Sequence, residues 1–119
     1  MEKERKYWNP EAEIMSSAAR HEVQLSKLQA QMRYAYDNSS LHRSVWDKAG
    51  VNPAQVKTLD DFQKQVPFID KDMVRCEQQR TGDPSGGMLC VSEDKLLMIA
   101  TSSGTTGLPT FLPVSRRDF

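Results

Sequence analysis

Apolar residues recur at helical spacing along the first third of the chain. The stripe consists of Leu25, Leu28, Met32, Ala35 and Tyr36. Because positions three and four residues apart share one face of a helix, the stripe predicts a helix over residues 17–37 that buries this face, with Ser16 as its N-cap. A second set, Val23, Ala30 and Tyr34, lies nearly opposite, so the helix is either contacted from two sides or carries scattered exposed apolar residues.

A shorter amphipathic segment follows the long helix. Residues 40–49 place Leu41, Val45 and Trp46 on one face, and Gly50 favours a left-handed C-cap. The short break between the two segments brings the helices together as an αα-hairpin.

Polar side chains mark the starts of three further helical turns. Asn9 before Pro10 predicts a short first turn. Thr58, with Asp61 three residues later, predicts a capped short helix, and Asp70 caps the next one. A catalytic pair is the alternative role for Asp61 and Asp70, but helix capping accounts for both residues without a catalytic function.

The C-terminal third predicts extended structure. The apolar runs 96–100 and 110–114 have the composition of buried strands, and Ser115 is a candidate N-cap for a further helix. Between the helices and the strands, residues 81–95 are turn-rich, and the glycines at their start favour a flexible connection.

These elements predict an α+β chain in three parts. Residues 1–80 form a helical segment, residues 81–95 a turn-rich connector, and residues 96–119 a strand–loop–strand unit. A two-stranded hairpin is marginal on its own. We therefore expect the chain to be the N-terminal fragment of a longer enzyme or a truncated reading frame.

Composition narrows the classes of function. Sixteen basic and sixteen acidic residues give no net charge over 119 residues, which argues against a nucleic-acid or anionic-membrane partner. The sequence has no membrane-length apolar run and no signal-peptide core, so we expect a cytoplasmic protein. Cys76 and Cys90 are expected to be reduced, and His21 and His42 have no partners at metal-ligand spacing, so no metal site is predicted.

The strongest candidate for chemistry is the uncharged stretch Thr101-Ser102-Ser103-Gly104-Thr105-Thr106-Gly107-Leu108-Pro109-Thr110. Its glycines let successive N–H groups turn inward around an anion, and its hydroxyls add donors. The spacing fits neither a Walker A loop nor a dinucleotide fingerprint. Because the donors are neutral, a bound polyphosphate needs Mg²⁺ to offset its charge. An ordinary hairpin loop without a ligand is the alternative.

Four segments carry a family resemblance, in order along the chain. They are Tyr7-Trp8-Asn9-Pro10, Arg33-Tyr34-Ala35-Tyr36-Asp37-Asn38-Ser39, Val66-Pro67-Phe68-Ile69-Asp70-Lys71-Asp72 and Ser102-Ser103-Gly104-Thr105-Thr106-Gly107-Leu108-Pro109-Thr110. Together they resemble the N-terminal part of the phenylacetate–coenzyme A ligase family of adenylate-forming acyl-CoA synthetases. The ending Pro109-Thr110 resembles this branch, whereas the wider superfamily usually has Pro-Lys. Leu108 stands where many members carry Lys, and residues 76–90 fit the family poorly.

The resemblance implies ATP-dependent, Mg²⁺-dependent adenylation of an aryl acid, followed by transfer of the acyl group to coenzyme A, as in phenylacetate catabolism. The residues it assigns to the ATP phosphates are Ser102, Ser103, Gly104, Thr105, Thr106 and Gly107, with Thr106 as the first choice for a hydroxyl contact. Catalytic residues are expected beyond Phe119, so the 119-residue chain is expected to be inactive alone. The implied partners are small molecules, and a homodimer is an expected assembly of the full-length enzyme.

Several alternatives stay open at this point. The acid is not specified, because phenylacetate, indoleacetate and hydroxylated arylacetates are all compatible with this region, as is a relative that adenylates coenzyme F420. The chain could also be a non-catalytic module that binds nucleotide or phosphate. In a third hypothesis the helical part is an interaction segment that uses Tyr34, and the loop is vestigial.

Overall fold

The computed structural model describes residues 6–102 and 109–118, and its longest element is the helix α2 (Ser17–Asn38). Ser16 caps this helix, since its Oγ accepts the N–H of Ala19 at 3.2 Å. The helix predicted from the apolar stripe is therefore confirmed, with an end one residue later than expected.

Shorter helices precede and follow α2 along the chain. They are α1 (Pro10–Glu13), α3 (Ser40–Lys48), α4 (Leu59–Gln65), α5 (Lys71–Thr81) and the single 3₁₀ turn η1 (Pro53–Gln55). Thr58 and Asp61 form the expected capping box at α4, and Asp70 Oδ1 accepts the N–H of Met73 at 2.8 Å at the start of α5. Gly50 has a φ of 69° after α3, as its predicted C-cap role requires. Both acids are thus helix caps, as predicted.

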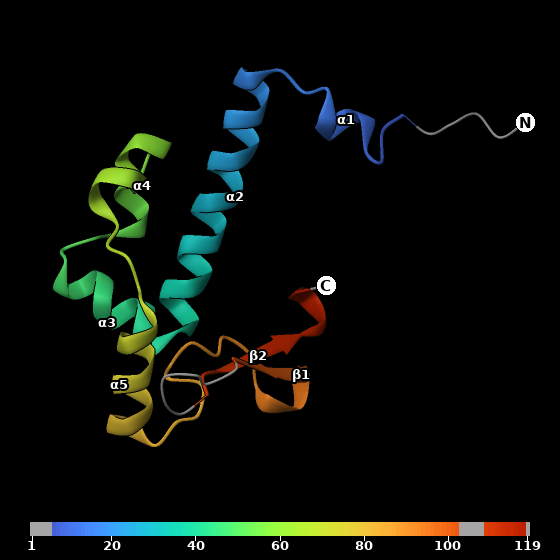
Figure 1. Cartoon of the computed structure of the whole chain (residues 1–119). Coiled ribbons are helices and arrows are strands. Elements are labelled where there is room, and N and C mark those ends of the chain that lie inside the picture. The colour runs from blue at the N-terminus through green and yellow to red at the C-terminus, as the bar shows by residue number, and fades with distance from the viewer. Residues whose placement is uncertain (1–5, 103–108, 119) are drawn as a thin grey trace, which may run out of the picture.

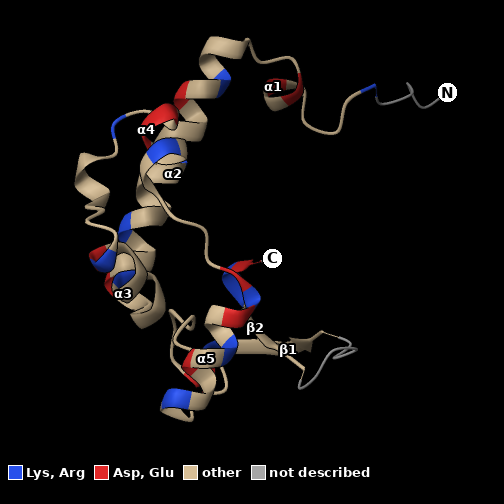
Figure 2. Cartoon of the chain, turned by 60° about the vertical axis from the view of Figure 1, so that its left-hand side comes forward, with Lys and Arg blue, Asp and Glu red and all other residues tan. Residues whose placement is uncertain are grey.

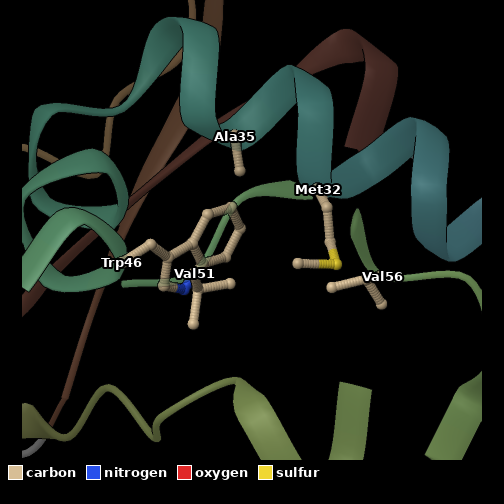
Figure 3. Close-up of a cluster of buried hydrophobic side chains, with 5 residues drawn as sticks. All are labelled: Met32, Ala35, Trp46, Val51 and Val56. Carbon is tan, nitrogen blue, oxygen red and sulfur yellow. The ribbon is translucent and has the colours of Figure 1, made fainter. Parts of the chain in front are cut away.

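The hydrophobic core lies where α2 packs against α3 and the chain that follows it (Figure 3). Its buried members are Met32, Ala35, Trp46, Val51 and Val56. Partly buried side chains pack around them: Leu28, Tyr36, Val45, Phe62 and Val66. Full burial of one large apolar side chain is worth about 1.5–3 kcal/mol. This cluster therefore fixes the αα-hairpin that the sequence predicted.

The C-terminal part of the chain is a β-hairpin between two single 3₁₀ turns. In order, its elements are η2 (Glu93–Lys95), β1 (Leu96–Thr101), β2 (Phe111–Ser115) and η3 (Arg116–Asp118). The strands are antiparallel, and Thr101 pairs with Phe111 at the end next to the loop. Ser115 ends β2, and its Oγ accepts the N–H of Arg117 at 3.3 Å, so the predicted cap starts a 3₁₀ turn.

The helices and the hairpin lie on different sides of α2. Figure 1 shows α3, α4 and α5 to the left of α2 and the hairpin to its right, near the C-terminal end of the helix. The radius of gyration is 17.8 Å, and the chain measures 56 × 40 × 29 Å. A compact domain of this length has a radius of gyration of about 13–14 Å. The α+β organisation is confirmed, in an extended rather than a globular arrangement.

Charges do not gather on one face of the molecule. Figure 2 shows basic and acidic residues interspersed along the helices. Within residues 6–102 and 109–118, no helix is long and apolar enough to cross a membrane.

Candidate phosphate-binding hairpin

The two strands lead into a loop whose mouth is formed by Ser102 and Thr110. The N–H of Ser102 donates to the carbonyl oxygen of Thr110 at 3.1 Å, and the N–H of Thr110 donates to Ser102 Oγ at 3.0 Å. These bonds continue the ladder one step beyond the pair Thr101 and Phe111. The pairing of the two predicted strands is confirmed, and this reciprocal pair holds the mouth closed. The expectation that the strands are buried is wrong, because most of their large apolar side chains are exposed.

Thr110 places a hydroxyl in an unusual environment beside the loop. Its side chain is 5% exposed, and its Oγ1 is buried without a hydrogen-bond partner in the part of the chain that the structure describes. A buried hydroxyl without a partner costs about 1–3 kcal/mol. This hydroxyl is enclosed in the structure, and a ligand oxygen reaches it only if the surrounding groups move.

The predicted site residues divide into two groups. Ser102 lies at the mouth, where its Oγ accepts one hydrogen bond and its own proton is committed to no described residue. The other residues assigned to the phosphates lie outside the described residues: Ser103, Gly104, Thr105, Thr106 and Gly107.

The connector before the hairpin is packed against the helices, in contrast to the flexible connection expected from its glycines. The carbonyl oxygen of Gly87 accepts bonds from Ser39 Oγ at 2.7 Å and from the N–H of Leu41 at 3.2 Å. Gly87 has a φ of 75°, and a Cβ there would lie 2.5 Å from Ser40 Oγ. A side chain at this position would be strained and would collide with α3. The glycine therefore permits a close approach and does not supply flexibility.

Asp83 stabilises the same connector through hydrogen bonds to two of its residues. Its carboxylate accepts bonds from Ser85 Oγ at 2.7 Å and from the N–H of Gly87 at 2.9 Å. Burial alone would raise the pKa of Asp83, but the hydrogen bonds from Ser85 and Gly87 outweigh it and lower the pKa below its usual value. The charged form of Asp83 thus stabilises the turn.

His42 has a structural role. Its Nδ1 lies 2.8 Å from Ser39 Oγ, whose single proton is donated to the carbonyl oxygen of Gly87. The proton between the two side chains is therefore on Nδ1, which donates to Ser39 Oγ. Burial lowers the pKa of His42, which favours this neutral form. The bond is local to the start of α3 and lies beside the connector.

Tyr34 links α2 to both sides of the hairpin. Its hydroxyl donates to the carbonyl oxygen of Cys90 at 3.1 Å, and the Arg117 guanidinium lies 5.3 Å from the centre of its ring. Cys90 precedes β1, and Arg117 follows β2. The residue that the sequence placed on a second helix face is therefore half-buried and contacts other parts of this chain.

A cavity of about 420 Å³ lies between the hairpin and the helices α2 and α3. Tyr34, His42 and Cys90 line it, together with Phe111 and Leu112 of β2. Burial raises the pKa of the Cys90 thiol, with a further contribution from Asp118, so Cys90 is not an activated nucleophile. The cavity thus separates part of the hairpin from α2 and α3, and Tyr34 contacts the chain on both sides of the hairpin.

Metal binding has no preformed ligand set in the described residues. Residues 6–102 and 109–118 contain no group of three or more His, Cys, Asp or Glu side chains placed to hold a metal ion. The backbone N–H groups of Ser102 and Thr110 are both committed to closing the loop mouth, so the donors left there are hydroxyls, which suit phosphate oxygens.

Comparison with known proteins covers nearly the whole chain. A family model described as the GH3 family N-terminal domain matches residues 17–119, including the stretch that resembled the family least. The phenylacetate–coenzyme A ligase of Aromatoleum evansii is 34% identical over 96 residues, which are 81% of this chain and 20% of that protein. The ligase of the same name from Pseudomonas putida is 31% identical over 106 residues, which are 89% of this chain and 23% of that protein.

Comparison with solved structures also identifies a CoA ligase as similar to this chain. A 2-hydroxyisobutyryl-CoA ligase in complex with 2-HIB-AMP and CoA, in the thioesterification state, superposes with a TM-score of 0.86 at 35% identity. An open conformation of that ligase gives 0.85 at 31% identity, and each match covers 94% of this chain and 23% of the solved one. The chain thus spans about a fifth of the length of its curated relatives. By this family match, and by a fold shared with CoA ligases, the chain belongs to the phenylacetate–coenzyme A ligase family of adenylate-forming enzymes and corresponds to their N-terminal part.

Proposed function

We propose that this chain supplies the ATP phosphate-binding hairpin of an arylacetate–coenzyme A ligase. The observation that carries the proposal is the loop mouth: Ser102 and Thr110 close an uncharged Ser/Thr/Gly loop, and among the described residues the buried Thr110 hydroxyl has no partner. Relatives named phenylacetate–coenzyme A ligase and a structural neighbour in complex with an acyl-adenylate and CoA support this assignment.

The reaction places a specific demand on this hairpin. A carboxylate oxygen of the aryl acid attacks the α-phosphorus of ATP, the acyl–phosphate bond forms, and pyrophosphate leaves. The coenzyme A thiolate then displaces AMP and gives the thioester. In-line attack requires the leaving β- and γ-phosphates to be held opposite the acid. Donors fixed in advance around those oxygens lower the barrier without a covalent step.

We assign the loop residues Ser102 to Gly107 to this task, with Thr106 as the first hydroxyl donor. The Ser102 hydroxyl accepts the N–H of Thr110, and its own proton has no acceptor among the described residues, so we assign that proton to a phosphate oxygen. Since these groups are neutral, Mg²⁺ bound to the nucleotide supplies the charge compensation.

The remaining machinery lies outside this chain in our proposal. The pocket for the aryl ring, the acid that binds the ribose and the lysine of a mobile domain are all expected in the part of the longer relatives that these 119 residues do not match. We infer that the partners are small molecules, namely ATP with Mg²⁺, an aryl acid and coenzyme A. A cytoplasmic location and a homodimer of the longer enzyme stay predictions.

A hybrid ligase tests the proposal. In the hybrid, this chain replaces the aligned region of the Pseudomonas putida enzyme, and phenylacetate-dependent exchange of labelled pyrophosphate into ATP is measured. We expect exchange by the hybrid and none by the 119-residue chain alone. A hybrid that melts cooperatively but catalyses no exchange would contradict the proposal, and exchange by the isolated chain would contradict the division of machinery. Binding of Mg²⁺–ATP by the chain, combined with an inactive folded hybrid, would favour a non-catalytic module.

A further inference from the structure

The hairpin has a weak apolar attachment to the rest of the molecule. Several large side chains of its strands are 40–59% exposed: Leu97, Met98, Ile99, Phe111 and Leu112. The cavity of about 420 Å³ separates part of β2 from α2 and α3. Because a two-stranded hairpin is marginal without packing against other elements, the few bonds that reach it have a large influence on its placement.

Those bonds converge on Tyr34. Its hydroxyl holds the carbonyl oxygen of Cys90, six positions before β1 begins at Leu96, and its ring lies under the guanidinium of Arg117, two positions after β2 ends at Ser115. The bonds of Ser39 and Leu41 to Gly87 act further upstream, on the connector. A single side chain of α2 therefore contacts the chain on both sides of the strand–loop–strand unit.

We propose that Tyr34 is a positioning residue for the phosphate-binding hairpin and fixes the loop mouth relative to α2. Loss of its hydroxyl releases the entry to β1, and loss of its ring also releases the exit from β2. The relevance to nucleotide binding rests on the proposed function, whereas the placement of the hairpin is a property of the chain itself.

Tyr36 provides a matched control on the same helix. Its hydroxyl donates to Asp47 Oδ1 at 2.6 Å, and the Arg43 guanidinium lies 5.6 Å from the centre of its ring. Tyr36 thus makes the same two kinds of interaction as Tyr34, but with residues of α3, and its ring also stacks on Trp46 with 6.3 Å between the ring centres. For either tyrosine, substitution by phenylalanine removes the hydrogen bond, and substitution by leucine removes the cation–π contact as well. Of the two, only Tyr34 touches the flanks of the hairpin.

The test is amide hydrogen exchange by NMR in the 119-residue chain. The Ser102 N–H, which donates to Thr110, reports the closed mouth, and amides within α2 report the helical core. We expect Tyr34→Phe to speed exchange at Ser102 about fivefold to tenfold, which corresponds to one lost hydrogen bond, and Tyr34→Leu to speed it more. Tyr36→Phe and Tyr36→Leu should leave the ratio of Ser102 exchange to α2 exchange unchanged.

Equal exchange at Ser102 in the wild type and in both Tyr34 variants would overturn the proposal. If Tyr34→Leu unfolds the chain, all amides accelerate together, and Tyr34→Phe, which keeps the ring, decides the question. A titration with inorganic tripolyphosphate and Mg²⁺, followed at the Gly104 and Gly107 amides, separates the two proposals. No shift in the wild type would contradict the phosphate-binding function but not the positioning role. If the probe binds, its dissociation constant should rise at least threefold in Tyr34→Leu and not in Tyr36→Leu.

Discussion

Ser102 and Thr110 exchange two hydrogen bonds at the base of the uncharged loop. The N–H of Ser102 donates to the carbonyl oxygen of Thr110 at 3.1 Å, and the N–H of Thr110 donates to Ser102 Oγ at 3.0 Å. One of the two bonds uses a side chain, so the closure of the mouth depends on the residue type at position 102 and can be altered without changing the strands.

Removal of that side chain is expected to open the mouth. In Ser102→Ala the buried N–H of Thr110 loses its acceptor, and we expect its amide exchange to accelerate about tenfold, which corresponds to roughly 1 kcal/mol for one hydrogen bond. Ser102→Thr keeps the hydroxyl and should exchange within about twofold of the wild type. NMR exchange rates at Thr110 check this prediction, and equal rates in Ser102→Ala and the wild type would contradict it.

Gly87→Ala tests whether the connector packs against α3. The substitution puts a Cβ at a φ of 75° and 2.5 Å from Ser40 Oγ. Gly82 is the matched control, because its φ is 73° but nothing lies within 4 Å of its Cβ position. We expect Gly82→Ala to lower the free energy of unfolding by about 1 kcal/mol and Gly87→Ala by about 2–4 kcal/mol. Urea denaturation measures both, and equal losses would show that the connector does not pack as described.

Asp83 gives the chain a pH dependence with a definite sign. Hydrogen bonds from Ser85 and Gly87 outweigh burial and lower its folded-state pKa below the ordinary value of 3.8. A lowered carboxyl pKa stabilises the fold above the unfolded pKa, and this contribution is lost as the pH falls through the folded value. The difference in unfolding free energy between the wild type and Asp83→Asn should therefore be constant from pH 7 to about pH 5 and shrink below pH 4. A difference that grows toward low pH would contradict this assignment.

The elements that the sequence predicted well depend on local signals. Ser16, the pair Thr58 and Asp61, and Asp70 each bond to an N–H within three residues, so their positions define helix starts without tertiary information. The apolar stripe of α2 could be recognised for the same reason, because its period requires only that one face be buried.

The contacts that place the hairpin could not be predicted in this way. Tyr34 bonds to Cys90 across 56 positions, and Ser39 bonds to Gly87 across 48. No local pattern distinguishes a tyrosine that reaches a distant carbonyl from one exposed on a helix face. From sequence alone, Gly87 is compatible with a flexible linker and with a tightly packed turn of positive φ. The packing of α3 against it distinguishes the two.

The residue composition of the loop predicted which residues form the candidate site. It did not predict the residues and the cavity that surround them. The sequence identified the hydroxyl-rich loop and its two flanking strands. The burial of Thr110 to 5% exposure has no signal in its own stretch of sequence, and the hollow beside β2 is lined by segments that are far apart in the chain. The surroundings of the loop mouth therefore depend on tertiary structure.

The most direct test of the central claim, that the uncharged loop holds the triphosphate of ATP, is the pyrophosphate exchange rate of the hybrid ligase with Thr106→Val and with Thr106→Ser. Valine keeps the shape of threonine and removes the hydroxyl, whereas serine keeps the hydroxyl. We predict that Thr106→Val lowers kcat/KM for ATP in the exchange reaction by about tenfold to a hundredfold, and that Thr106→Ser stays within about threefold of the parent. Equal exchange by the parent hybrid and Thr106→Val, with both proteins folded, would contradict the assignment of this hydroxyl and of the loop to the phosphates.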